Sequence, residues 1–315
     1  MAADPVPDLH PQASAALRRW AQEPSVAGFG PAEVADKRRR DRLVAEAEPR
    51  EDVASVQDVD ADGVPSRLYW PRDSSWEPDS RAHLPRSRGC LLFLHGGGFV
   101  FGDLDTHDAQ ARRVANRTGM AVLAVDYRRP PEHRFPAAPD DVDTALAWLM
   151  AQGSGVGIDV SRVVALGDSA GGNLALVAAL RNPNAFAATV LVYPFLDPRR
   201  GFASYGFSDG GLTAEEAAWY WQQYAARPED LDDPDLAPLR SDRFATLPPT
   251  LVVAATHDVL VDEDEELARR IGEAGGDVEL STYSGMVHGF WRHPELFDAA
   301  EACLAEIAAF LDRTV

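Results

Sequence analysis

A serine lies between two glycines in the segment Gly-Asp-Ser-Ala-Gly at 167–171, which gives Ser169 the spacing G-x-S-x-G. An apolar run at 163–166 precedes this segment, and a run of helix-forming residues at 170–180 follows it. Strand, sharp turn and helix, with serine at the turn, are the surroundings of a nucleophile elbow. The pattern predicts that Ser169 is a nucleophile, although the same five residues are also typical of an ordinary turn.

Three consecutive glycines follow the apolar run 90–94, in a His-Gly-Gly-Gly segment at 95–98. Successive glycines cost conformational entropy, but they let bare backbone approach a ligand and direct N–H groups towards it. Such groups stabilise the oxyanion of a tetrahedral intermediate, and this kind of segment accompanies the G-x-S-x-G elbow. The amides of Gly97, Gly98 and Ala170 are the predicted donors, and the histidine is expected to hold the loop by hydrogen bonds. A flexible glycine loop is the alternative.

A serine hydroxyl needs a base to take its proton and an acid to orient that base. After an elbow of this kind the acid follows the serine in the chain, and the histidine follows the acid. Asp258 lies just past the apolar run 251–255, and His288 just past the run 278–283. Each is therefore expected at the carboxyl end of a strand, at the edge of the sheet where Ser169 emerges.

Two other residues compete for these roles. His293 lies at the start of the last predicted helix, and Asp262 begins the predicted helix 262–273. We favour His288 as the base because it directly follows a strand and because Gly289 leaves room beside it. Asp262 is expected to cap its helix, which is a common task for aspartate at that position.

Short apolar runs alternate with helical patterns along most of the chain. The predicted strands are 53–58, 64–70, 90–94, 121–126, 163–166, 189–193, 251–255 and 278–283, and the predicted helices among them are 106–117, 140–150, 170–180, 262–273 and 295–311. A turn signal at 60–63 makes the first two strands a hairpin. The alternation predicts an α/β fold with a mostly parallel eight-stranded sheet and helices on both faces.

Two regions interrupt this alternation. Residues 1–50 are expected to form one or two helices, with arginines at 38–40, and residues 195–226 insert a Gly-rich loop and a helix at 214–226. In an open α/β sheet, extra elements after the carboxyl ends of strands lie near the ligand crevice. We therefore expect a small helical cap from residues 1–50, with a contribution from 195–226, over a catalytic domain at 51–315.

Aromatic side chains are concentrated on the helix of this insertion. Trp219, Trp221 and Tyr224 are the predicted substrate-binding residues there, and Phe99, directly after the glycines, is a fourth. They suggest an apolar pocket for an acyl or aryl group. The alternative for the aromatic residues of this helix is that they pack on the body of the protein as part of its core.

Composition narrows the class of protein. The net charge of −20 argues against nucleic acid or an anionic membrane surface as a partner. The only cysteines, Cys90 and Cys303, exclude a disulfide framework and are expected to be buried. The N-terminus shows no signal-peptide pattern, and no uncharged apolar stretch reaches the ~18 residues that span a bilayer. The sequence therefore predicts a soluble, cytoplasmic protein with no membrane span.

Five sets of residues match, in order, the motifs of one enzyme family. They are His95-Gly96-Gly97-Gly98, then Tyr127-Arg128 with Pro131-Glu132-His133-Arg134-Phe135-Pro136-Ala137-Ala138, then Gly167-Asp168-Ser169-Ala170-Gly171-Gly172, then Asp258, then His288-Gly289-Phe290. With them the chain resembles the hormone-sensitive-lipase-like esterases, or bacterial family IV esterases, of the α/β-hydrolase fold. The match covers roughly residues 50–310. Arg129-Pro130 and Val259 depart from the family, which usually has Leu-Ala and Pro at those places; neither change removes a reacting group.

The resemblance implies a Ser169–Asp258–His288 triad, an oxyanion hole at Gly97, Gly98 and Ala170, and a preference for short- to medium-chain esters. We expect a carboxylic ester hydrolase acting on small acyl or aryl esters. No cofactor or metal motif is present in the sequence. An amidase or peptidase with the same triad, or a binding protein that has lost catalysis, are the alternatives. A homodimer is plausible by resemblance alone.

Overall fold

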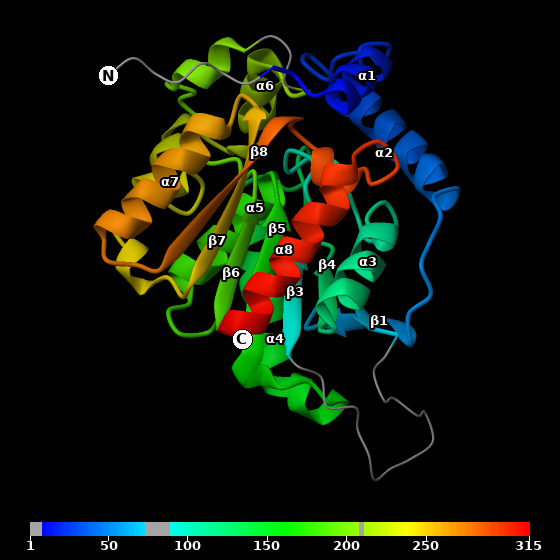
Figure 1. The fold of residues 1–315 in the computed structure, drawn as a ribbon, viewed down its shortest axis with the longest axis vertical. Coiled ribbons are helices and arrows are strands. Elements are labelled where there is room, and N and C mark those ends of the chain that lie inside the picture. Colours follow the sequence, from blue (N-terminus) through cyan, green and yellow to red (C-terminus); the bar gives the residue numbers. More distant parts are fainter. Residues whose placement is uncertain (1–7, 73–88, 208–210) are drawn as a thin grey trace.

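The computed structural model describes residues 8–72, 89–207 and 211–315. A single sheet with the strand order β1-β2-β4-β3-β5-β6-β7-β8 runs through it (Figure 1). Its strands are β1 Ser55–Ala61, β2 Val64–Trp70, β3 Cys90–Leu94, β4 Ala121–Val125, β5 Val163–Asp168, β6 Ala188–Val192, β7 Thr250–His257 and β8 Val278–Val287. β2 is antiparallel to β1 and β4, and all other neighbours are parallel. The predicted mostly parallel, eight-stranded sheet is confirmed.

Helices cover both faces of this sheet. The α-helices of the described residues are α1 Pro11–Trp20, α2 Pro31–Glu46, α3 Asp108–Thr118, α4 Ala137–Gln152, α5 Ala170–Arg181, α6 Ala214–Tyr224, α7 Val261–Glu273 and α8 Asp298–Thr314. Alternate residues of β3 enter two different cores: Leu92 packs in the core that includes α4, α5 and α7, and Leu91 in the one that includes α3 and α8. Successive side chains of a strand point to opposite faces, so a strand covered on both sides reads as a continuous apolar run.

Two strands at one edge of the sheet are longer than the sequence patterns predict. β7 continues to His257 and β8 to Val287, and these two residues pair with each other beyond an irregularity after Ala255. The added residues of β8 include Ser284 and Gly285, which lack the apolar character of a buried strand. Pairing with β7 extends the strand, because each added residue gains ladder hydrogen bonds.

The N-terminal helices α1 and α2 approach α6 at one end of the molecule (Figure 1). Ser25, between α1 and α2, donates its hydroxyl proton to Glu216 at 2.8 Å, and the Trp219 indole donates to the carbonyl of Phe29 at 3.2 Å. Of the expected cap segments, residues 1–7 and 208–210 lie outside the described residues. Across the described ranges, no helix has both the length and the apolar character needed to cross a bilayer.

Candidate active site

Ser169 occupies a sharp turn between β5 and α5. Its backbone has φ 54° and ψ −120°, a combination that costs energy for a residue with a side chain and that persists only where the surrounding structure enforces it. The turn is tight because the backbones pass close to each other: a Cβ on Gly171 would collide with the carbonyl of Leu94. This is the strand–turn–helix arrangement of a nucleophile elbow.

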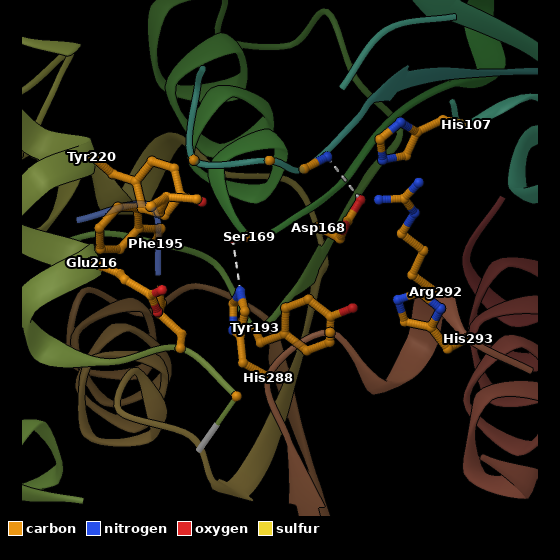
Figure 2. A pocket seen from close by; sticks show the side chains of 17 residues that line it. His107, Asp168, Ser169, Tyr193, Phe195, Glu216, Tyr220, His288, Arg292 and His293 are labelled. Atoms are coloured by element: carbon orange, nitrogen blue, oxygen red, sulfur yellow. Dashed lines mark hydrogen bonds between the residues drawn. The ribbon is translucent and has the colours of Figure 1, made fainter. Parts of the chain in front are cut away.

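The Ser169 hydroxyl, the His288 ring and the Asp258 carboxylate form one hydrogen-bonded line. Ser169 Oγ lies 2.9 Å from His288 Nε2 (Figure 2), and His288 Nδ1 lies 2.6 Å from Asp258 Oδ2. With the Nδ1 proton directed at the carboxylate, Nε2 is free to accept the serine proton. Asp258 is fully buried, and its other oxygen accepts the Leu260 N–H at 3.0 Å, which fixes the orientation of the carboxylate.

The extended pairing of β7 with β8 brings Asp258 and His288 together. The last paired residues, His257 and Val287, are directly followed by Asp258 and His288. The competing residues have other partners: His293 lines the same cavity as the serine, but its Nδ1 lies 3.1 Å from Glu295, and Asp262 accepts the Ser204 N–H at 2.8 Å. The predicted helix cap at Asp262 is wrong, because α7 begins one residue earlier, at Val261, and its cap position is Leu260.

A glycine-rich turn faces the serine. We call residues 95–101 the glycine loop. Gly97 and Gly98 both have positive φ, 117° and 59°, and both line the same cavity as Ser169. The Gly97 carbonyl accepts the N–H groups of Val100 and Phe101 at 3.1 and 2.8 Å, which closes the turn. Ala170 is the first residue of α5, where N–H groups have no partner inside the helix.

Asp168, the residue before the serine, supports the glycine loop. Its Oδ1 accepts the Gly96 N–H at 3.1 Å. Burial raises the pKa of Asp168 to about 6, while the positive charge of Arg292 and the hydrogen bond from Gly96 oppose that rise. This hydrogen bond links the residue before Gly97 to the residue before Ser169, so it fixes the predicted oxyanion donors relative to the serine.

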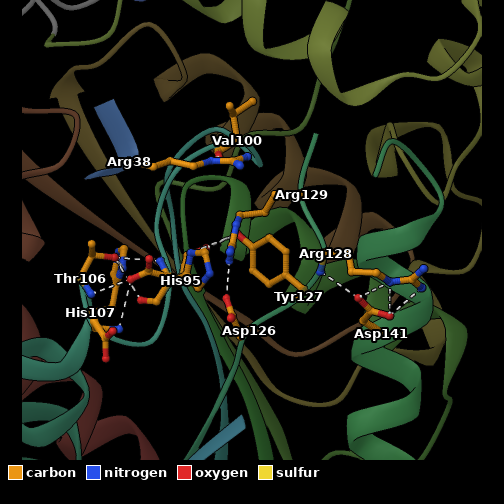
Figure 3. Close-up of polar contacts among 12 residues, drawn as sticks. Arg38, His95, Val100, Thr106, His107, Asp126, Tyr127, Arg128, Arg129 and Asp141 are labelled. Atoms are coloured by element: carbon orange, nitrogen blue, oxygen red, sulfur yellow. Dashed lines mark hydrogen bonds and ion pairs between the residues drawn. The ribbon is translucent and has the colours of Figure 1, made fainter. Parts of the chain in front are cut away.

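His95 supports the loop from behind (Figure 3). Its ring stacks between Tyr127 and His107, with centroid distances of 4.3 and 4.9 Å, and its Nδ1 lies 2.8 Å from the Gly96 carbonyl. The Tyr127 hydroxyl donates to the His95 carbonyl at 2.7 Å. Burial lowers the pKa of His95 to about 4, so the ring is neutral at pH 7. These contacts fit a residue that holds the loop.

A cavity of about 240 Å³ opens beside Ser169 and His288. Tyr220, Phe195 and Glu216 lie on one side of the serine, and His107, Arg292 and His293 lie on the other (Figure 2). The remaining lining residues are Val26, Gly96, Gly97, Gly98, Asp168, Tyr193, Gly211, Leu212 and Gly289. Val26 belongs to the segment between α1 and α2, so the N-terminal region contributes to the wall.

The four aromatic residues predicted to bind substrate do not line this cavity. Phe99, Trp221 and Tyr224 are buried in the core, where Phe99 and Tyr224 stack at 3.7 Å. Trp219 packs against Phe101 at 6.1 Å in a separate small cluster. The aromatic residues predicted on the helix of the insertion therefore pack as part of the core, which was the alternative to substrate binding.

Three aromatic residues that sequence reasoning did not select line the cavity instead: Tyr193, Phe195 and Tyr220. Tyr220 lines the cavity from α6, and Phe195 lines it from the segment after β6. The ring of Phe195 lies 4.3 Å from Trp221, so the predicted residue is one layer behind the actual wall. Helical spacing alone did not separate Tyr220 from its aromatic neighbours, because α6 has apolar partners on more than one side.

Within the described parts of the chain, no group of three or more His, Cys, Asp or Glu side chains is arranged to hold a metal ion. Cys90 and Cys303 are both buried and both free.

Comparisons with known proteins identify the family of this chain. Residues 91–292 match a family model described as alpha/beta hydrolase fold. The chain is 35% identical to an ethyl acetate hydrolase of Pseudomonas putida, over 82% of this chain and 81% of that protein. It is 33% identical to the carboxylesterase NlhH of Mycobacterium tuberculosis, over 80% of this chain and 79% of the relative.

Solved structures give the same result. An ester hydrolase from the metagenome of Lake Arreo, complexed with a bipyridine phosphonate derivative, aligns with a TM-score of 0.86 at 30% identity, over 96% of this chain and 98% of that one. An esterase of Pyrobaculum calidifontis aligns with a TM-score of 0.82 at 31% identity, over the same shares. The chain therefore belongs to the α/β hydrolases, and within them to the hormone-sensitive-lipase-like, bacterial family IV esterases, which are carboxylic ester hydrolases.

Proposed function

We propose that this chain is a serine carboxylesterase that hydrolyses short- to medium-chain acyl or aryl esters through Ser169, His288 and Asp258. The observation that carries the proposal is the line of two hydrogen bonds from the serine hydroxyl through the imidazole to the buried carboxylate. Relatives named as ethyl acetate hydrolase, carboxylesterase and acetyl esterase support it.

The reaction begins when His288 Nε2 takes the proton of Ser169 as Oγ attacks the ester carbonyl carbon. The carbonyl π-bond opens and its electron pair moves to the oxygen, which the amides of Gly97, Gly98 and Ala170 stabilise. Asp258 stabilises the resulting imidazolium. His288 then donates its proton to the alkoxide oxygen as the C–O bond breaks, and the alcohol leaves an acyl-enzyme on Ser169.

Deacylation repeats these steps with water. His288 removes a proton from the water molecule as its oxygen attacks the acyl carbon, the same amides hold the oxyanion, and Ser169 Oγ is the leaving group. The proton returns from His288 to the serine oxygen. The carboxylic acid is released and the site returns to its starting state, so no cofactor is consumed.

Cavity size supports small substrates. The volume beside the serine, about 240 Å³, is below the range of roughly 300–1,000 Å³ typical of drug-sized ligands. Tyr220 and Phe195 form an apolar wall on one side, which suits a short acyl chain or an aryl group. Nitrophenyl esters of two to about twelve acyl carbons would define the preferred length.

Substitution of the triad and of its two competitors tests the assignment. Ser169→Ala and His288→Ala should lower kcat about 10⁶-fold, and Asp258→Asn about 10⁴-fold, as in serine triads generally. His293→Gln and Asp262→Asn are the matched controls and should keep kcat within about tenfold of the parent. Loss of activity in His293→Gln with retention in His288→Ala would contradict the proposal. Nitroanilides with the same acyl groups, assayed beside the nitrophenyl esters, separate an amidase from an esterase.

A further inference from the structure

Two arginines one helical turn apart on α2 reach from the N-terminal region to the body of the protein. Arg38 and Arg42 have the i, i+4 spacing that places side chains on one helix face. Arg38 Nε donates to the Val100 carbonyl at 2.9 Å (Figure 3), and its Nη2 donates to the Pro130 carbonyl at 2.5 Å. Its Nη1 lies 2.9 and 3.0 Å from the two carboxylate oxygens of Glu132. One guanidinium thus joins α2 to two other segments, one at Val100 and one at residues 130–132.

Arg42 makes a second attachment just beyond the glycine loop. Its Nε donates to Asp103 Oδ2 at 2.5 Å, and Asp103 is 5% exposed. The other carboxylate oxygen of Asp103 accepts the N–H groups of Asp105 and Thr106, at 3.1 and 2.8 Å. The chain is therefore held at residue 100 by Arg38 and at residue 103 by Arg42, both from α2.

The carbonyl that Arg38 binds belongs to the turn that carries the predicted oxyanion donors. Val100 lies two residues after Gly98, and its N–H closes the turn on the Gly97 carbonyl. Gly97 and Gly98 have no side chains with which to anchor themselves, and glycine loses more conformational freedom on folding than any other residue. The position of their amides therefore depends on contacts made by neighbouring residues.

We propose that Arg38 is a positioning residue for ester hydrolysis: by holding the Val100 carbonyl from α2, it orients the Gly97 and Gly98 amides towards the oxyanion. The inference rests on the proposed function. It makes the N-terminal region part of the catalytic apparatus as well as a wall of the cavity. Arg39 is the natural control, because its side chain is 67% exposed and pairs with Asp36 on α2 itself.

Hydrogen exchange tests the attachment directly and needs no substrate. In Arg38→Ala, amides of the glycine loop should exchange about tenfold faster than in the parent, while a peptide covering β5 and α5 keeps its protection. Arg39→Ala should match the parent in both regions. Unchanged exchange in the glycine loop of Arg38→Ala would overturn the inference.

Steady-state kinetics test the consequence for catalysis. Arg38→Ala should lower kcat about 10- to 100-fold and leave KM within about threefold, because misplaced oxyanion donors weaken binding of the transition state. Arg39→Ala should keep both values. A rise in KM with kcat preserved would mean that Arg38 serves substrate binding alone, and equal effects in both variants would mean general damage; either result overturns the inference.

Added guanidinium, far below denaturing concentrations, separates a local role from a structural one. It should restore part of the kcat of Arg38→Ala by occupying the vacated space, and it should not change Arg39→Ala. No restoration in a folded Arg38→Ala protein would count against positioning. If Ser169→Ala kept the parent's turnover, the proposed function would fail, and the exchange comparison would still decide whether Arg38 holds the loop.

Discussion

The glycine loop beside Ser169 is held by the side chains of neighbouring residues. Asp168 accepts the Gly96 N–H, and His95 stacks behind the loop as a neutral ring. The sequence motifs and their order predict a nucleophile at Ser169, an acid at Asp258 and a histidine that holds the loop. Such predictions are possible because each residue is recognised from the strand or the glycines next to it. The contact from Asp168 to Gly96 joins residues 72 positions apart, and no local pattern predicts it.

Two buried histidines should make the protein less stable in mild acid. Burial lowers the pKa of His95 to about 4 and that of His107 well below its usual value, whereas both take up protons near pH 6.5 when unfolded. Between pH 6.5 and 4 the unfolded chain binds protons that the folded chain does not. The contribution of these two histidines to stability therefore falls as the pH falls, by about 3 kcal/mol for His95.

Urea unfolding at several pH values between 7 and 4.5 measures this effect. His107→Gln should flatten the loss of unfolding free energy with falling pH, because one buried histidine is gone. His133→Gln removes an exposed ring and should keep the parent's slope. Identical slopes in the two variants would show that burial of His107 does not carry the dependence.

At the scale of elements, α6 shows where sequence reasoning stops. Its aromatic residues were correctly identified as a cluster, but their faces were not. Trp221 and Tyr224 point into the main core with Ala217, and Trp219 packs in the small cluster with Val34 and Phe101. A helix with apolar partners on several sides has no single apolar stripe, so periodicity cannot tell the cavity wall from the core.

Substitutions on α6 should separate these two kinds of position. Tyr220→Ala removes part of the cavity wall and should shift the preferred acyl chain to greater length with little change in Tm. Tyr224→Ala removes a buried core ring and should cost about 3–5 kcal/mol of stability without changing the preferred length. Nitrophenyl ester series and thermal unfolding measure the two effects. A shifted length preference in Tyr224→Ala alone would reverse the assignment.

For the whole molecule, the strands of the sheet could be predicted from the sequence, but the residues at which β7 and β8 end could not. Alternating apolar runs fixed the number and type of the strands, since each core strand is buried on both faces. The ends of β7 and β8 follow from their pairing with each other, which composition does not reveal. The sequence places residues 1–50 near the site as an expected cap, but no local pattern predicts the contacts that these helices make: Trp20 of α1 packs against Phe297 and His293, at the other end of the chain.

The N-terminal region should influence substrate choice through the residue that reaches the cavity. Val26 lines the cavity, whereas Val34 is buried in the same small cluster without lining it. Val26→Ala should change the relative kcat/KM of short and longer esters, because the smaller side chain enlarges the cavity next to the serine. Val34→Ala should lower Tm by a similar amount and keep the parent's selectivity. Equal selectivity in both variants would contradict a role for this region in the pocket.

The most direct test of the account is stoichiometric labelling with an organophosphate, followed by mass spectrometry of the digested protein. The reagent phosphorylates an activated serine and mimics the tetrahedral species that the glycine loop is proposed to bind. We predict one adduct per chain, on Ser169, with ester hydrolysis lost in proportion to labelling and no adduct in His288→Ala. Full hydrolysis by a completely labelled protein, or an adduct on another residue that accounts for the lost activity, would contradict it.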